Sequence, residues 1–181
     1  CHSLITKTKT MNLKDLTRPL EISDVDFRVQ SVNKGGYATI LAYKDARVDM
    51  NRLDEVVGPL NWQREHTDEN RSCTVSIWNE KNNQWVSKTD VGTKSMTEAA
   101  KGLASDSFKR ACFNWGIGRE LYDYPMISIK LNSDELTNGK ANYNFKLREW
   151  KWISFFKEGK LQGLAGKDTN GKVRFNFGTF K

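Results

Sequence analysis

Apolar and polar residues alternate along SCTVSIW, residues 72–78, which is the pattern of a β-strand with one buried face. Similar segments recur along the chain, separated by residue pairs that contain glycine or asparagine and favour tight turns. A hairpin is therefore predicted wherever such a pair joins two strand-like segments. The predicted strands are 27–33 and 37–44, 72–78 and 85–92, and, in the last third of the chain, 126–132, 142–156, 160–166 and 172–180.

Two other segments show the three-to-four spacing of apolar positions that predicts a helix. The first begins near Asp45, a suitable N-cap, and ends at Gly58-Pro59. The second begins at Ser95, which forms a capping box with Glu98, and Gly116 marks its end. About 20 residues lie between these signals, enough for a helix of about 30 Å. Its buried stripe is predicted to contain Met96, Ala99, Ala100, Leu103, Ala104, Ser107, Phe108, Ala111, Cys112 and Trp115.

Because the strands are grouped apart from the helices, the sequence predicts an α+β fold. We expect an antiparallel β-sheet with the long helix packed across it, followed by a strand-rich C-terminal extension. The predicted segments are an N-terminal arm over 1–24, a core over 25–124 and a basic, β-rich extension over 125–181. Residues 1–10 precede Met11 and are interpreted as an upstream, non-native segment.

The charge is distributed unevenly along the chain. The 181 residues contain 29 Lys and Arg against 22 Asp and Glu, a net charge of +7. Residues 126–181 hold 11 of the basic and 5 of the acidic side chains, so most of the excess lies there. A basic surface favours a polyanionic partner, which is usually nucleic acid or an anionic surface.

Several classes of protein lack support in the sequence. No apolar run approaches the ~20 residues of a membrane span, and no apolar signal-peptide segment is visible. Three cysteines without a C-x-x-C pair, and two histidines without ligand-spaced partners, argue against a metal site. Cys73 and Cys112 lie in apolar-patterned segments, so buried free thiols in a reducing compartment are expected. No catalytic set of paired carboxylates emerges, and we do not expect an enzyme.

The polar face of the second predicted helix carries a row of cations. Lys101, Ser105 and Lys109 are spaced by four residues, which places the two ammonium groups about 12 Å apart along the axis. Arg110 adjoins Lys109, and Asp106 lies four residues before it, so an ion pair within the helix is expected. From spacing alone this face is either an ordinary solvated surface or a site for phosphates.

Two ordered motifs surround this row of cations. ARVDMNRLDEVVGPLNWQREH, residues 46–66, opens with Arg47, and DVG at 90–92 precedes EAAKGLASDSFKRACFNWGIGRELYD at 98–123. Together they resemble the signature region of the Rad52 single-strand annealing family, closest to its bacteriophage or prophage members. The resemblance covers roughly residues 38–124.

The resemblance implies a β-β-β-α core that assembles into a ring or helical filament and binds single-stranded DNA in a basic groove. It assigns the DNA contacts to Arg47, Lys101, Lys109 and Arg110. The segment between DVG and the helix is shorter than in nuclear members, which leaves Lys94 as its candidate for a second DNA site.

We therefore expect an ATP-independent protein that binds and anneals single-stranded DNA in recombination and double-strand break repair, without a cofactor or metal. No G-x-x-x-x-G-K-[ST] motif for nucleotide binding is present. Expected partners are single-stranded DNA, other copies of the chain, and a recombinase or single-strand binding protein, but no membrane. The resemblance places the protein in a bacterial host cytoplasm, associated with the nucleoid. Alternatives are an end-protection module that binds without annealing, and a metal-dependent nuclease.

A second candidate surface lies in KLREWKWISFFK, residues 146–157. If this segment is a strand, Trp150 and Trp152 share one face with Arg148 nearby and Lys151 between them, and bases could stack on the two rings. The alternative is that the tryptophans cover the sheet or a contact between subunits.

Overall fold

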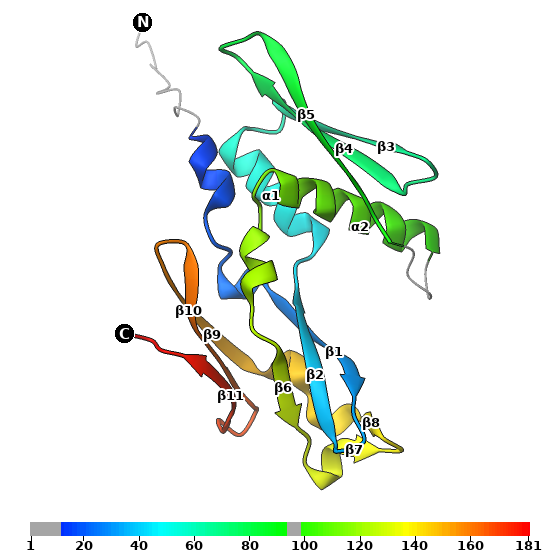
Figure 1. Ribbon diagram of the computed structural model, residues 1–181, viewed down its shortest axis with the longest axis vertical. Helices are drawn as coiled ribbons and strands as arrows, with labels where there is room; N and C mark the ends of the chain where they lie inside the picture. Colours follow the sequence, from blue (N-terminus) through cyan, green and yellow to red (C-terminus); the bar gives the residue numbers. More distant parts are fainter. Residues whose placement is uncertain (1–11, 94–98) are drawn as a thin grey trace, which may run out of the picture. The chain divides into compact units, whose positions relative to one another are not determined.

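The computed structural model describes residues 12–93 and 99–181, without the side chains of 99–101. The chain forms two compact units, each assembled from separated segments. Unit 1 combines the segment that ends at Arg18 with Asp49–Gly116, and unit 2 combines Pro19–Val48 with Ile117–Lys181 (Figure 1). The predicted segment boundaries at 24 and 124 stay a prediction.

The sheet of unit 1 is antiparallel, with the order β3 (Trp62–Thr67), β4 (Ser72–Asn79) and β5 (Gln84–Val91). Alternation along the central strand β4 places Cys73, Val75 and Ile77 in the core, as the pattern predicts. The opposite face carries pairs of hydroxyl groups that join β4 to β5. One of these pairs links the hydroxyls of Thr74 and Thr89 at 2.7 Å.

Unit 1 also contains the helix α2 (Ala99–Asn114), which packs against β4 and β5. The indole N–H of Trp115 donates to the carbonyl of Val75 at 3.0 Å, which fixes the end of the helix to the sheet. Gly116 follows with a φ of 94°, a left-handed conformation that ends the helix at the predicted residue. Of the predicted stripe, five members are buried: Leu103, Ser107, Phe108, Ala111 and Cys112.

The helix α1 (Ala46–Val56) begins in unit 2 and continues in unit 1. Asp45 caps it as predicted, because its carboxylate accepts a hydrogen bond of 2.8 Å from the backbone N–H of Arg47. Farther along, the buried Arg52 donates to the carbonyls of Asp15 and Arg18, at 3.1 and 2.7 Å. These bonds tie the short 3₁₀ helix η1 (Leu13–Thr17) to α1.

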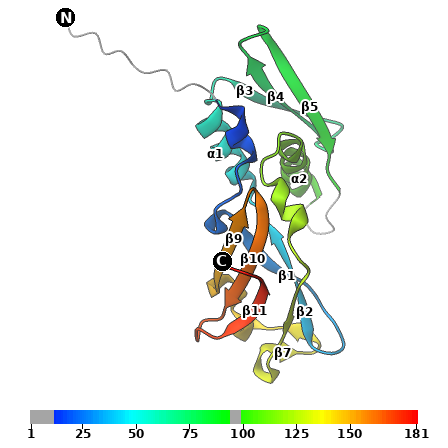
Figure 2. The ribbon, with the colours of Figure 1, turned by 60° about the vertical axis from the view of Figure 1, so that its left-hand side comes forward.

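Unit 2 contains two antiparallel three-stranded sheets and a small two-stranded one. Figure 2 shows the C-terminal sheet with its strands side by side. The first sheet has the order β1 (Asp26–Val32), β2 (Tyr37–Tyr43), β6 (Ile127–Lys130). The second has the order β11 (Val173–Gly178), β10 (Lys160–Lys167), β9 (Lys151–Lys157). The small sheet pairs β7 (Leu136–Thr137) with β8 (Lys140–Ala141).

Aromatic side chains join the two larger sheets in one core. The ring of Phe27 on β1 stacks on Trp152 of β9 with centroids 3.9 Å apart. A buried ion pair lies at the edge of this core, where Arg174 binds Glu135 through two hydrogen bonds of 3.0 and 2.9 Å. The side chain of Arg174 is only 5% exposed, so its charge is buried within unit 2 and is not available to a ligand at the surface.

The structure confirms a mixed α/β class with antiparallel sheets, and it confirms the hairpins at Gly35-Gly36 and Asn82-Asn83. The strand predicted over 142–156 is wrong in its first half. The 3₁₀ helices η5 (Tyr143–Phe145) and η6 (Leu147–Glu149) replace it, and the strand begins at Lys151. Lys146 separates the two helices with a φ of 43°, which no strand residue adopts.

Two features are absent from the described part of the chain. No helix there is long and apolar enough to cross a membrane. Within the same residues, no three or more His, Cys, Asp or Glu side chains gather in a group that could hold a metal ion.

Candidate nucleic-acid interface

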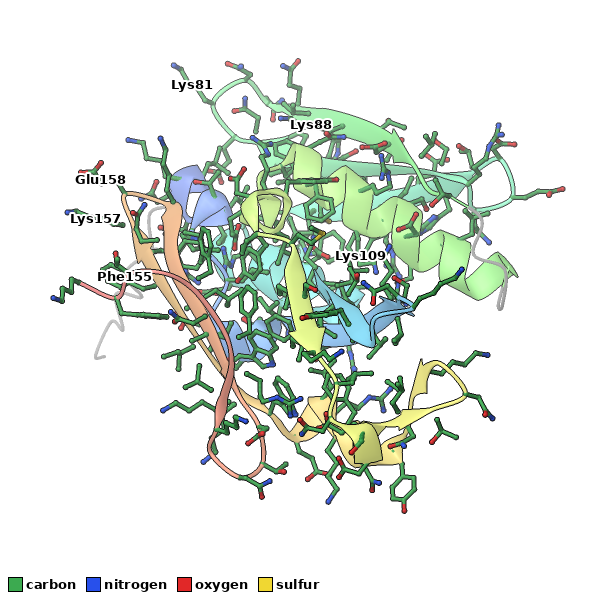
Figure 3. All side chains as sticks on the ribbon, turned by 60° about the horizontal axis from the view of Figure 1, so that its bottom comes forward. Lys81, Lys88, Lys109, Phe155, Lys157 and Glu158 are labelled. Atoms are coloured by element: carbon green, nitrogen blue, oxygen red, sulfur yellow. The ribbon has the colours of Figure 1, made fainter. Side chains whose placement is uncertain are left out.

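Lys109 is a candidate cation without a hydrogen-bond or ion-pair partner among the described residues. It lies on α2 and is half-buried, and it forms no ion pair or hydrogen bond with any residue that the structure describes (Figure 3). Successive residues of a helix point about 100° apart, so Lys109 and Arg110 face different directions. Lys109 is therefore available to a phosphate, whereas Arg110 has a protein partner.

Arg110 pairs with a strand residue and not with its helix neighbour. Its Nε lies 3.6 Å from Oδ1 of Asp90 at the end of β5, and 39% of the side chain is exposed. The predicted ion pair with Asp106 is wrong, because Asp106 accepts a hydrogen bond of 2.9 Å from the backbone N–H of Thr93 instead. The tertiary contact outweighs the i, i+4 spacing, and it orients the guanidinium along the edge between α2 and β5.

The Asp-Val-Gly motif holds the end of β5 against α2. The other carboxylate oxygen of Asp90 accepts a hydrogen bond of 3.2 Å from the side-chain amide of Asn114. A Cβ atom on Gly92 would lie 2.9 Å from the backbone nitrogen of Ser107 and 3.1 Å from a carboxylate oxygen of Asp106. Only glycine permits this approach, so the motif positions the helix on which Lys109 and Arg110 lie.

Two further cations, which the sequence prediction missed, lie on the face of the sheet that α2 covers. Arg64 on β3 and Lys88 on β5 are both register partners of Val75 on the central strand. They are therefore about 10 Å apart across two strand spacings. Only the strand register could have revealed them, because the two residues are far apart in the chain.

Both of these exposed cations contact aromatic rings that belong to α2 or follow it. The guanidinium of Arg64 lies 4.7 Å from the ring centroid of Phe108, and the ammonium of Lys88 lies 4.8 Å from that of Trp115. Lys88 also donates to the carbonyl of Asn114 at 2.9 Å, where the negative end of the helix dipole favours a cation. These contacts hold the charges in place, and both residues stay exposed.

Two titratable groups lie beside Arg64, on its own strand and on the next one. Burial lowers the pKa of His66 below its ordinary value, and the charge of Arg64 lowers it further, which favours the neutral imidazole. Its Nδ1 lies 3.4 Å from the hydroxyl of Ser107 on α2. Burial raises the pKa of the Cys73 thiol to about 11, as expected for an unreactive core cysteine.

Arg47 lies in unit 2, in the first turn of α1. Its side chain is 80% exposed, and its Nε lies 2.9 Å from Oδ1 of Asp45. The hydrogen bond and the charge of Asp45 raise the pKa of Arg47 further above its ordinary value. The cation is thus held by the capping carboxylate at the start of α1.

Two other predicted site residues fall partly or wholly outside the described structure. Lys94 lies outside the described residues. Lys101 is helical, but its side chain is not described, so its row with Lys109 stays a prediction.

The second candidate surface is built differently from the strand that was expected. Trp150 is buried, its indole N–H donates to the carbonyl of Phe145 at 3.1 Å, and its ring packs 6.2 Å from that of Trp152. The tryptophans therefore cover the sheet in unit 2, as the alternative interpretation had it. Arg148 and Lys151 are exposed.

Comparisons with known proteins bear on this interface. A family model described as Rad52/22 family double-strand break repair protein matches residues 74–141. The single-stranded DNA-binding protein DdrA of Deinococcus radiodurans is 31% identical over 115 residues, which are 62% of this chain and 55% of the relative. The chain thus spans about half the length of that relative. The predicted family resemblance is confirmed over the segment that carries Asp90, Lys109 and Arg110.

Proposed function

We propose that the protein binds single-stranded DNA with the α2 region of unit 1 and anneals complementary strands during double-strand break repair. Two likenesses support this proposal. The matching family consists of double-strand break repair proteins, and the relative from D. radiodurans is by name a single-stranded DNA-binding protein. We expect the protein to act as a binding protein and not as an enzyme, in the cytoplasm of a bacterial host.

The observation that carries the proposal is the gathering of cations around α2. Lys109 has no partner among the described residues, Arg110 is paired loosely and partly exposed, and Lys88 and Arg64 lie against aromatic rings. Each cation that contacts a phosphate releases condensed counterions, which gives affinity without sequence preference. Binding by such a surface is expected to weaken steeply with salt.

The anchoring of α2 explains how this surface keeps its shape. Asp90 and Asp106 tie the helix to the end of β5, and Gly92 lets the two backbones meet. Phosphates are then met by charges that are already in place, so little ordering entropy is lost on binding.

Annealing requires that the bound strand keep its base edges free. A surface that contacts phosphates leaves these edges exposed, so that a second strand can test its register. Pairing itself then drives the reaction, and no ATP is needed. We expect several copies to line up in a ring or filament so that a long strand is held extended.

The test removes the two helix cations. We expect the Lys109→Ala, Arg110→Ala double variant to lose at least about tenfold in affinity for a labelled oligo-dT strand, because two phosphate contacts disappear. Fluorescence anisotropy at two salt concentrations measures the affinity and the salt slope. Lys157→Ala with Lys160→Ala, two exposed lysines at the β9–β10 turn, is the matched control and should bind as the unmodified protein does.

A folded double variant with unchanged affinity would contradict the α2 interface. Folding is checked by the thermal melting curve, because removal of Arg110 also breaks its pair with Asp90. Lys109→Ala alone avoids this complication and should still weaken binding.

A second candidate function is single-strand binding without annealing, which the name of the relative favours because it mentions binding alone. Two complementary labelled strands separate the possibilities when they are mixed without ATP or metal ions. Faster pairing supports annealing, binding without acceleration supports the second function, and shortened strands would indicate a nuclease.

A further inference from the structure

A groove of about 920 Å³ lies in unit 2, between β1 and the segment from Gly139 to Glu149. All residues from Phe27 to Val32 line it, those that face the core and those that face solvent. Since successive side chains of a strand point to opposite faces, a groove lined by all of them follows the edge of the strand. β1 is the outer strand of its sheet, and among the described residues it pairs with β2 alone.

The groove is strongly basic. Arg28 on β1, Lys140 on β8, and Lys146 and Arg148 on the facing segment line it, against Glu149 as its one lining acid in the described chain. None of these four cations forms an ion pair with a described carboxylate, and all four are exposed. The positive charge is therefore not neutralised within unit 2.

The wall opposite β1 is held in place by the core and by hydrogen bonds. Phe145 and Leu147 are buried, which fixes the backbone on both sides of Lys146. The side-chain amide of Asn142 donates to the carbonyl of Asp134 and to the hydroxyl of Thr137, at 2.8 and 2.9 Å. The cations thus project from a fixed segment into a preformed groove.

An open strand edge selects its ligand by hydrogen bonding. It presents N–H donors and C=O acceptors, and only a partner with both kinds of group can satisfy it. The phosphate backbone of a nucleic acid offers acceptors alone, whereas an extended peptide offers both. The unpaired cations add a preference for carboxylates on that peptide.

We propose that this groove binds an acidic peptide segment of a partner protein, which adds to β1 as an extended strand. The seven residues of β1 match a peptide of about seven residues, or about 24 Å. Carboxylates at alternate positions of such a peptide share one face and meet Arg28 and Arg148. This site lies in unit 2 and does not depend on the DNA surface proposed for α2.

Fluorescence anisotropy with a labelled peptide of alternating Asp and Thr tests this proposal on the full chain. The peptide should bind, and Arg28→Glu with Arg148→Glu should weaken binding by at least about tenfold. A second peptide keeps the same side chains and carries a methyl group on every backbone nitrogen. It has the same charge but no backbone N–H donor, so it should bind at least about tenfold more weakly.

Lys157→Glu with Lys160→Glu is the matched control, since it makes the same charge change in unit 2 at a turn outside the groove (Figure 3). It should leave peptide binding within about twofold. Equal binding by the N-methylated peptide would overturn strand addition, and unchanged binding by the folded Arg28, Arg148 variant would overturn the site. If the acidic peptide does not bind, the proposal is overturned. The cations would then be a nucleic-acid site if the Arg28, Arg148 variant loses affinity for oligo-dT, and protection of the strand edge if it does not.

Discussion

Among the described residues, each unit has an arginine that faces a glutamate with two hydrogen bonds, but the two environments are opposite. In unit 1, one nitrogen of Arg18 donates to both oxygens of Glu55 at 3.1 Å, and the arginine side chain is 46% exposed. In unit 2, both nitrogens of Arg174 bind Glu135, and almost none of the pair is exposed. The two pairs therefore differ in burial and in how the guanidinium contacts the carboxylate.

The buried arginine also has partners that its exposed counterpart lacks. Arg174 donates to Asp168 at 3.3 Å and to the carbonyl of Lys130 at 2.8 Å, and its guanidinium lies 5.2 Å from the ring centroid of Trp150. Because water cannot replace these partners, the loss of one leaves the others unsatisfied. An exposed pair, in contrast, exchanges its partner for water at little cost.

The same contrast explains which cations of the molecule suit a phosphate. Arg110 and Asp90 lie between the two extremes, at 3.6 Å and partly exposed, so the guanidinium can turn to a phosphate while the carboxylate keeps its bond from Asn114. Arg174 cannot do so without breaking the core of unit 2. Charge alone therefore does not identify a residue that binds phosphate. The protein groups that already hold the side chain determine whether it can turn to a phosphate.

The largest expected effect follows from breaking the buried pair. Arg174→Met should lower the free energy of unfolding by about 3–5 kcal/mol, because Glu135 and Asp168 lose the charge that compensates them. Arg18→Met should cost at most about 1 kcal/mol, because its pair is exposed. Urea unfolding followed by circular dichroism measures both values, and equal losses in the two variants would contradict the comparison.

A smaller effect is expected where unit 1 brings two backbones together. Gly92→Ala should destabilise the protein by about 1–3 kcal/mol, because the new methyl group would lie 2.9 Å from the backbone of Ser107. Gly35→Ala in unit 2 is the control, since its methyl would meet a side-chain oxygen of Asn33 at 3.3 Å, which can move.

Hydrogen exchange followed by mass spectrometry locates the damage of the glycine variant. Protection should fall in β5 and α2 and stay unchanged in β1 and β2. Loss of protection in both units, or in neither, would show that Gly92 does not act through the contact between strand and helix.

The sequence predicted the elements whose signals are local. The hairpin glycines, the capping Asp45 and the stop at Gly116 each act within a few residues, and the structure confirms all three. The buried stripe of α2 was also predictable, because its spacing reports a single covered face. The family motif placed Lys109 and Arg110 in the candidate site.

The features that could not be predicted depend on distant residues. The partner of Arg110 is chosen by the end of β5, and Arg64 becomes a neighbour of Phe108 only through the register of three strands. Over 142–150, the buried residues Phe145 and Leu147 alternate as in a strand, although the left-handed Lys146 between them ends any strand. Alternation reports burial, and it does not distinguish a strand from short 3₁₀ turns.

The smallest expected effect is a pH dependence of stability that arises from the buried pair. Burial alone would raise the pKa of Glu135, but the hydrogen bonds from Arg174 and from the backbone N–H of Asn132, with the charge of Arg174, hold it below its ordinary value. The pKa of Asp168 is lowered in the same way, because hydrogen bonds from Lys172, Arg174 and Asn170 outweigh its burial. The unfolded chain therefore takes up protons at these carboxylates before the folded chain does. The stabilisation that these carboxylates give is complete at neutral pH. It is lost as the pH falls below about 5 and then through their lowered pKa values in the folded chain.

Thermal melts from pH 7 to pH 3 should show a flatter acid limb for Glu135→Gln than for the unmodified protein, and parallel curves would mean that the buried pair contributes no stability linked to pH.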